Sequence, residues 1–321
     1  MSVQLIDNNN TGSHHTNPHN NNFLSNDSFT NIINNPNLIS FATHNVRNCS
    51  SETKLQNIDS FFNNFNIDIL GLSETHLNLL QAHHLNKNIH NKSFKYFFHS
   101  SNRYQNCQGV GLVVRNNLST HIFNQASFFD RIIYLDFQFK NKFKLRVIQV
   151  YLPASYHDRK DYQYRLQVQK KLMNILIDSL RHNFHIILMG DFNIDISRKY
   201  RSKLQKQLQN FLHNILNLGF IHTLTPFQST YPPTFRSSSS YDSTSYIDYI
   251  FTSTNLSHDL TSFHILNDSC YLYSTDHYPL LITLYKKIFF PKLLQLTKSN
   301  IKSQNSPSFT TRPLIFIGIF F

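Results

Sequence analysis

The stretch HIILMGDFNID, residues 185–195, decides how this chain folds. Its first four residues include three that are strongly apolar, and a glycine, two aspartates and an asparagine follow closely. An apolar run that ends abruptly in polar residues is typical of a buried strand that brings side chains to the edge of a sheet. Such an edge suits either a structural turn or a group that faces a metal-bound phosphate. The rest of the chain has to decide between these interpretations.

The composition allows a globular protein with a preference for anionic partners. The chain has 321 residues, 40% of them hydrophobic, which suffices for one sizeable core or two small ones. Its formal net charge is +12, with a pI of about 9.5. A basic surface favours nucleic acid or an anionic membrane face, although an ordinary solvated Lys/Arg surface explains the charge equally well.

Cysteine usage and the chain ends bear on the compartment. Cys49, Cys107 and Cys270 are scattered and form no CxxC pair, so neither a zinc site nor a disulfide framework is indicated. The N-terminus lacks a secretory pattern, and the apolar run PLIFIGIFF is shorter than the roughly 20 residues that span a bilayer. We therefore expect an intracellular, non-secreted protein with no membrane partner and no obligate protein partner, and the nucleus is a candidate compartment.

The hydrophobic pattern predicts one folded domain between two irregular ends. Residues 1–37 are rich in Asn, Ser and His and lack periodicity, so we expect a disordered leader. Residues 38–287 carry alternating strand and helix patterns and form the expected domain. The periodicity fades after Lys287, and we expect residues 288–321 to be a poorly ordered tail.

Strands outnumber helices within the expected domain. Strands are expected at 38–46, 67–74, 109–115, 131–139, 144–153, 185–193, 246–253 and 278–285, and helices at 50–65, 157–183 and 201–218. Ser50 or Ser51 is the candidate cap of the first helix, and residues 230–245 are expected to form a loop. Because several strands follow one another directly, we expect an α/β (α+β) fold, a four-layer sandwich of two packed mixed sheets flanked by helices.

Polar side chains recur at or near the ends of these strands. They are Asn45, Glu74, Tyr151, Asp191, Asn193, Asp248, Asp276 and His277. Taken singly, each has an ordinary structural explanation, since Asp and Asn are common turn residues. Two packed sheets would bring them to one rim, and it is their joint order along the chain that favours a functional site.

That order resembles the endonuclease/exonuclease/phosphatase family, the fold of DNase I and of the AP-type endonucleases. The resemblance covers roughly residues 38–286, and its most specific signatures are GDFN and the Asp-His pair before the closing strand. SETH and YIDYIF add to them. The segments THNVRN, LSETHL, GVGLVVR and SYIDYIFTS point to the endonuclease of LINE-type retroelements as the most similar branch.

The resemblance implies a metal site made of hard oxygen ligands. Glu74 would be the main Mg²⁺ ligand with Asn45 beside it, and Asp276 would help to hold or position the metal. One or two carboxylates suffice because Mg²⁺ keeps several waters, and Mn²⁺ is the alternative ion.

The resemblance also implies catalytic roles on the same rim. Asp191 would orient and deprotonate the attacking water, and His277, oriented by Asp248, would stabilise the phosphate's developing charge. Asn193 would hold the phosphate, and Tyr151 would donate to a phosphate oxygen or to the leaving group. Gly190 would allow the tight turn before these residues.

Three further residues are expected to meet substrate. Arg47 stands where AP-type endonucleases often carry an acid, so it should weaken a second metal site and pair with a phosphate. Thr234 in YPPTF matches a hydroxyl position of the retroelement branch, and a plain turn residue is an equally good explanation. Arg115 would contact the DNA backbone, although exposed strand arginines are ordinary. Asp195 receives no functional role and is expected to be a solvated or capping acid.

The leading hypothesis is a Mg²⁺-dependent phosphodiesterase that acts on DNA or another nucleic acid, most simply a retroelement-type DNA-nicking endonuclease. Each phosphate contact by Lys or Arg adds salt-dependent affinity, which agrees with the positive charge. One alternative is a family member that acts on inositol phosphates or sphingomyelin, but no additional recognition loop is found. Another is a catalytically inert retroelement-derived fragment, although every expected catalytic position is filled.

Overall fold

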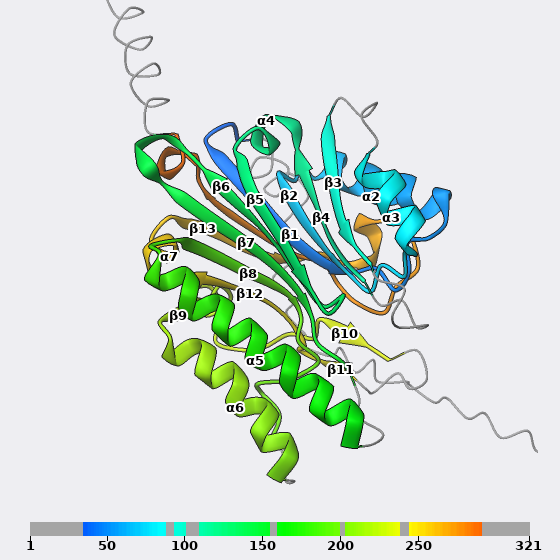
Figure 1. The fold of residues 1–321 in the computed structure, drawn as a ribbon, viewed down its shortest axis with the longest axis vertical. Helices are drawn as coiled ribbons and strands as arrows, with labels where there is room; N and C mark the ends of the chain where they lie inside the picture. The colour runs from blue at the N-terminus through cyan, green and yellow to red at the C-terminus, as the bar shows by residue number, and fades with distance from the viewer. Residues whose placement is uncertain are drawn as a thin grey trace, which may run out of the picture.

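Two six-stranded sheets form the centre of the molecule (Figure 1). The computed structural model describes residues 35–87, 93–100, 109–154, 159–199, 203–237 and 244–290. The first sheet has the order β13-β14-β1-β2-β4-β3, formed by β1 (Leu38–Asn45), β2 (Ile69–Ser73), β3 (Phe94–His99), β4 (Val110–Arg115), β13 (Leu260–Ile265) and β14 (Leu280–Tyr285). The second has the order β5-β6-β7-β8-β12-β9, formed by β5 (Ile122–Phe128), β6 (Ile132–Gln138), β7 (Lys144–Tyr151), β8 (His185–Asp191), β9 (Phe220–His222) and β12 (Asp248–Ser253).

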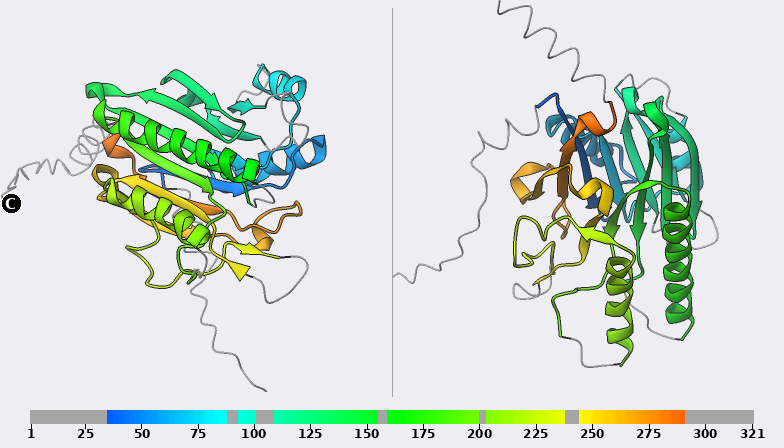
Figure 2. Two further views of the ribbon diagram at one scale, coloured as in Figure 1. Left: turned by 60° about the horizontal axis from the view of Figure 1, so that its bottom comes forward. Right: turned by 90° about the vertical axis from the view of Figure 1, so that its left-hand side faces the viewer.

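Helices cover the outer faces of both sheets (Figures 1 and 2). α2 (Glu52–Asn64) and α3 (Leu79–Asn86) pack on the first sheet, and α5 (Arg159–Arg181) and α6 (Lys203–Asn217) pack on the second. Short α4 (Asn116–Ser119) and α7 (Thr254–Ser257) follow β4 and β12, and three 3₁₀ turns lie at Lys140–Lys142, Asp268–Cys270 and Lys286–Ile288. The predicted four-layer sandwich is therefore confirmed.

Three apolar cores separate the four layers. The core between the sheets includes Phe41, Leu135 and Met189, all buried. A second lies between the second sheet and its helices, and a third between the first sheet and α2 and α3. The core between the sheets continues to Phe289, which is fully buried beyond the expected domain boundary at Lys287. The expected leader, except its last three residues, and the tail from residue 291 lie outside the described residues.

The two parallel strand pairs place the polar strand ends at one edge. β1 runs parallel to β2 and pairs Asn45 with Ser73, and β7 runs parallel to β8 and pairs Tyr151 with Asp191. Parallel neighbours need a crossover connection, and α2 and α5 provide it. β12 is antiparallel to β8, so its first residue, Asp248, pairs with Asp191 at the same edge.

A buried polar network fixes the register between the two sheets below this edge. Thr43 Oγ1 in β1 donates to Gln149 Oε1 in β7 over 3.1 Å, and Gln149 Nε2 donates to Ser73 Oγ in β2 over 2.8 Å. Gly71 makes room for this contact, because a Cβ there would lie 1.9 Å from Gln149 Oε1. Buried polar groups are costly unless paired, so the network favours this one alignment of the sheets.

The sequence pattern missed several short or exposed elements. These are α3, β3, β5, β9, β13 and the ribbon of β10 (Phe235–Arg236) and β11 (Thr244–Ser245) inside the expected loop. β5 is an edge strand with a largely solvent-facing surface, so it carries no continuous apolar run. The cap of α2 is Ser51, whose side chain accepts from Lys54 N. In the part of the chain that the structure describes, no helix is both long and apolar enough to cross a bilayer.

Candidate active site

The strand ends of both sheets meet in one polar centre. Asn45 ends β1 and Glu74 directly follows β2 in the first sheet, whereas Asp191 ends β8 in the second. Asn45 Nδ2 donates to Asp191 Oδ2 over 2.9 Å and so joins the two sheets across the rim. The structure therefore brings these strand-end residues together, as the sequence order predicts.

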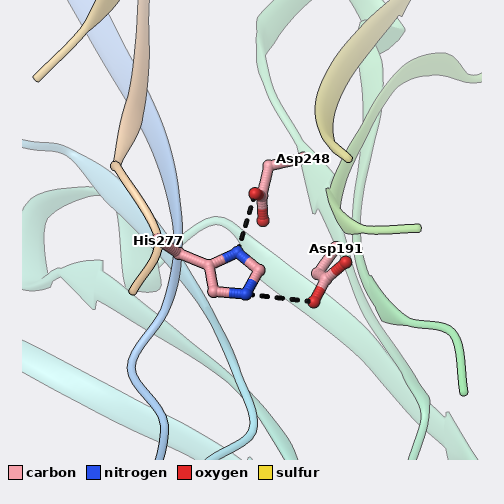
Figure 3. A group of neighbouring side chains, drawn as sticks. All are labelled: Asp191, Asp248 and His277. Atoms are coloured by element: carbon pink, nitrogen blue, oxygen red, sulfur yellow. Dashed lines mark hydrogen bonds and ion pairs between the residues drawn. The ribbon is translucent and has the colours of Figure 1, made fainter. Parts of the chain in front are cut away.

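His277 lies between two buried carboxylates (Figure 3). Its Nδ1 donates to Asp248 Oδ2 over 2.8 Å, because a carboxylate oxygen can only accept from it. Its Nε2 lies 3.9 Å from Asp191 Oδ2 and 4.0 Å from Asp276 Oδ1. Asp248 therefore fixes the ring, and Nε2 faces the space in front of Asp191.

Burial and neighbouring charges give the histidine and aspartate opposite roles. Burial alone would lower the pKa of His277, but the carboxylates of Asp248, Asp191 and Asp276 raise that pKa to about 9. Burial, followed by the charge of Asp248, raises the pKa of Asp191. Near neutral pH His277 is thus an imidazolium, and Asp191 has an unusually high proton affinity for a carboxyl group. This pairing suits an acid and a base that work together.

The turn after β8 holds Asp191 rigidly. Asp191 Oδ1 accepts from the backbone N–H of Asn193 over 2.9 Å, and Asn193 Nδ2 donates to Leu152 O over 2.9 Å. Asn193 adopts a left-handed φ of 50°. Gly190 has a φ of 141°, and a Cβ there would lie 1.9 Å from Val150 O. The expected need for glycine therefore arises from both backbone conformation and close approach of β7.

Glu74 and Asn45 form an oxygen-rich corner beside this centre. Burial raises the pKa of Glu74, but hydrogen bonds from His76 and Asn45 outweigh it, so its net pKa is lowered. Glu74 also has a left-handed φ of 58°, an unusual conformation for a residue other than glycine. Asn45 Oδ1 accepts from Arg47 N over 3.0 Å and retains one lone pair. The ionised carboxylate of Glu74 fits a hard cation such as Mg²⁺, and Asn45 Oδ1 would join it if the amide N–H groups that face Glu74 and Asp191 turned away.

A second group of possible ligands is already committed to other contacts. Ligand atoms of Asp191, Asp248 and His277 lie within 4.8 Å of one another. However, both nitrogens of His277 face carboxylates, and a protonated imidazole has no lone pair for a metal. The Glu74 corner is therefore the better fit for an ion.

Asp276 and Arg47 close the exposed side of the rim. Arg47 Nη1 lies 3.1 Å from Asp276 Oδ2, and the Arg47 side chain is 54% exposed. Thr275 Oγ1 donates to Asn45 O over 2.8 Å and ties the two loops together. Arg47 thus sits beside the expected metal ligand Asp276, with part of its guanidinium open to an incoming anion.

Tyr151 faces the centre together with an arginine that the sequence analysis missed. Burial, helped by the charges of Glu74 and Asp191, raises the pKa of Tyr151, so its hydroxyl stays protonated and can donate. The guanidinium of Arg131 lies 4.6 Å from the Tyr151 ring centroid. Arg131 is 5% exposed, and its buried Nη1 finds no hydrogen-bond partner among the described residues. In the sequence, the one indication that Arg131 lies near the site was its position directly before β6, opposite Tyr151.

The structure gives Thr234 a supporting position instead of contact with substrate. Its side chain is fully buried, and Oγ1 accepts from the backbone N–H groups of Ile247 and Asp248, each over 3.0 Å. Its carbonyl accepts from Tyr278 N over 2.7 Å. The expectation of a substrate contact is thus corrected: Thr234 fastens the segment of Asp248 to the segment that follows His277.

Arg115, which was also expected to bind substrate, lies away from the rim and makes structural contacts. It lies at the far end of β4 from Ser73, since Val110 at the start of β4 pairs with Ser73. Its guanidinium donates to the carbonyls of Ile67 and Phe62 and to Asn63 Oδ1. Arg115 therefore secures the end of α2, where last-turn carbonyls need donors.

Asp195 is a capping acid but not a solvated one. It is 7% exposed, and Oδ1 accepts from the backbone N–H and the hydroxyl of Ser197. It thus supports the loop after Asn193 without facing the rim.

A buried acid–histidine centre beside an oxygen-ligand corner, at the strand ends of a four-layer sandwich, defines a hydrolase acting on phosphate esters. The sequence matches the model of the Endonuclease/Exonuclease/phosphatase family over residues 42–277, and the chain belongs to this family. It is therefore a hydrolytic enzyme of the phosphoesterase class. A search of curated protein sequences finds no match.

Solved structures share the fold at low sequence identity. A 3′ phosphatase from Neisseria, NExo, bound to a product DNA hairpin, is 19% identical, with a TM-score of 0.63 and coverage of 76% of this chain and 98% of that one. The AP endonuclease LMAP from Leishmania major is 15% identical, with a TM-score of 0.64 and coverage of 78% and 88%. The endonuclease domain of TRAS1, a telomere-specific non-LTR retrotransposon, is 12% identical, with a TM-score of 0.52 and coverage of 77% and 98%.

Proposed function

We propose that this enzyme is a Mg²⁺-dependent DNA endonuclease of the retroelement type, which nicks DNA by hydrolysing a phosphodiester bond. The observation that carries the proposal is His277, held 2.8 Å from Asp248 with its Nε2 facing Asp191 and the Glu74 corner close by. A phosphodiester displacement needs a base for water and positive charge for the phosphate. These side chains offer both within one rim.

Positive charge supports DNA as the substrate. The chain carries a formal net charge of +12, and two arginines flank the rim, Arg131 beside Tyr151 and Arg47 beside Asp276. A guanidinium is suited to phosphate because it presents several donors in one plane, and Arg131 Nη1 and the exposed part of Arg47 retain donors for it. The neighbouring structures include one bound to a DNA hairpin and one from a retrotransposon, which agrees with this substrate class.

The protein side chains divide the work of hydrolysis. Asp191 would accept the proton of the attacking water, whose oxygen forms the new bond to phosphorus. His277 would neutralise the charge that develops on the phosphate, while Asp248 keeps its ring in place. Tyr151 would donate to a phosphate oxygen or to the departing oxygen as the P–O bond breaks, and Asn193 would help to hold the phosphate.

The expected metal would occupy the Glu74 corner. Glu74 and Asn45 would hold it, with Asp276 alongside, and when bound it supplies Lewis-acid charge at the phosphate. Mn²⁺ fits the same oxygen donors and is the alternative ion.

The test is conversion of supercoiled plasmid to open circles by the purified full-length chain, with Mg²⁺ or with EDTA. Asp191→Asn and His277→Ala should abolish Mg²⁺-dependent nicking. Asp178→Asn, which alters a solvent-exposed Asp–His pair at the end of α5, should not. Nicking that persists in the two site variants, or in EDTA, would point to a contaminating nuclease. If the folded protein leaves plasmid intact but hydrolyses inositol phosphates or sphingomyelin, then these esters, and not DNA, are its substrates.

A further inference from the structure

We propose that His44 is a positioning residue, which holds the main chain of His277 from the outer face of the first sheet and thereby sets where the catalytic imidazole lies. The kinetic part of this inference rests on the proposed nuclease function. The structural part does not, and the experiment below separates the two.

His44 contacts the peptide group of His277 directly. It lies on β1, is 1% exposed, and its Nε2 is 3.0 Å from His277 O. A carbonyl can only accept, so Nε2 carries a proton, and Nδ1 of the neutral ring accepts from Tyr273 Oη over 2.7 Å. Both ring nitrogens are therefore used, and the tautomer is fixed by the partners.

Other side chains hold the same short segment. Tyr271 Oη lies 3.2 Å from His277 O and also 2.7 Å from Asp268 Oδ1. On the other side of the residue, the backbone N–H of His277 donates to Thr275 Oγ1 over 3.3 Å. The backbone N–H and carbonyl of His277 are thus both bound by side chains, in a connection between β13 and β14 with little regular structure.

The ring of His44 is itself held by aromatic neighbours. Its centroid lies 5.0 Å from that of Tyr271, 5.4 Å from that of Tyr273 and 6.1 Å from that of Phe61 on α2. Because α2 and β1 are parts of the rigid first sheet and its covering layer, they provide a fixed reference for the loop. His44 therefore anchors the main chain of His277 to β1 and α2.

The position of the His277 main chain matters because its ring is fixed only at one nitrogen. Asp248 holds Nδ1 at 2.8 Å, while Nε2 stands 3.9 Å from Asp191. If His277 O loses His44, the carbonyl keeps only the longer contact with Tyr271 Oη, at 3.2 Å, and the main chain of His277 can shift enough to move Nε2 relative to the phosphate. A misplacement of about 1 Å in an active site can lower the rate on the order of 100-fold.

The chain offers a matched control in His222. This histidine lies on β9 of the second sheet, is 4% exposed, and its Nε2 is 2.9 Å from Tyr246 Oη. It also packs against aromatic rings, those of Tyr231 and Phe251. His222 thus shares burial, a tyrosine partner and aromatic packing with His44, but its bonded partner is a side chain and not the peptide of a catalytic residue. Leucine at either position should lower the melting temperature to a similar extent.

The kinetic test compares His44→Leu, His44→Gln and His222→Leu in the full-length chain on supercoiled plasmid. For His44→Leu we expect kcat to fall by roughly 10- to 100-fold, with KM and the half-saturating Mg²⁺ concentration within about threefold of wild type. His44→Gln should recover most of kcat, because its amide donates to His277 O and accepts from Tyr273. His222→Leu should keep the wild-type kcat at a temperature where it is folded. Equal kcat values for the two leucine variants would overturn the inference.

The structural test uses a label that this sequence makes unique. Among its 18 histidines, only His277 is followed by tyrosine, so ¹³C′-histidine with ¹⁵N-tyrosine gives one carbonyl correlation, that of His277. Loss of a hydrogen bond moves a carbonyl ¹³C′ signal upfield, which we expect in His44→Leu and not in His222→Leu. An unmoved signal in His44→Leu would refute the contact. If the wild-type protein nicks no DNA, the proposed function fails, and this signal alone decides whether His44 holds His277.

Discussion

Replacement of Asp248 by asparagine should separate the charge of this carboxylate from its geometry. Asn keeps an oxygen that accepts from His277 Nδ1, and Thr234 still binds the backbone N–H of residue 248. The pKa of His277 is about 9 in the protein, against an ordinary 6.5, which corresponds to about 3 kcal/mol in favour of the imidazolium. Asp248 is the largest of the charges that raise it, so the variant's pKa should fall back toward the ordinary 6.5.

This shift predicts a specific change in the pH profile of nicking. At pH 8 the imidazolium is about 90% populated with a pKa of 9, but only about 3% with a pKa of 6.5. Asp248→Asn should therefore be slower than wild type by about 30-fold at pH 8, and this gap should narrow toward pH 6, where both proteins carry the imidazolium. The assay is the initial rate of plasmid nicking between pH 5.5 and 9.5 in Mg²⁺, with Asp178→Asn as the control. A loss of rate that is the same at every pH would refute the electrostatic reasoning.

The pH dependence of stability tests the charge effect of Asp248 independently of activity. A histidine whose pKa is raised by folding stabilises the folded protein fully below its ordinary pKa of 6.5, and this contribution is lost as the pH rises toward 9. The melting temperature of Asp248→Asn should thus fall furthest below that of wild type near pH 6, and the gap should narrow by pH 9.5.

Three further outcomes test other parts of the structure. Glu74→Gln should weaken Mg²⁺ binding at least tenfold by isothermal titration calorimetry, because an uncharged amide replaces the corner's ionised carboxylate. Gly71→Ala should lower the free energy of unfolding by about 1–3 kcal/mol in a denaturant titration, since the new methyl group displaces Gln149 from between the sheets. Arg115→Gln should cost a similar amount of stability through lost bonds to carbonyls, yet leave KM for plasmid unchanged.

Much of the fold was predictable because long strands and helices leave a local pattern. β1, β2, β7 and β8 are rich in apolar residues, and polar residues that mark the rim stand at or directly after their ends. Edge strand β5 and the ribbon of β10 and β11 were missed, because a half-exposed or two-residue strand has no apolar periodicity of its own.

The site was predictable where residue type and order carried the information. Asp191, Asp248 and His277 do meet, since each stands at a strand end in the expected order. Thr234 and Arg115 were assigned to substrate because sequence shows that a hydroxyl or a cation is present but not which way it points. The contact between His44 and His277 joins residues 233 positions apart, and no local pattern encodes it.

The strand order of the first sheet also sets when the residues of the site can come together during synthesis of the chain. All strands of the second sheet lie between residues 122 and 253, so Asp191 and Asp248 are made before His277. β14 inserts between β13 and β1, and His277 directly precedes it in the chain. Until residue 285 has emerged from the ribosome, β1 of the nascent chain lacks its neighbour β14, and Asp191 and Asp248 lack His277. The buried acid–histidine centre is thus completed only when nearly the whole domain has been made.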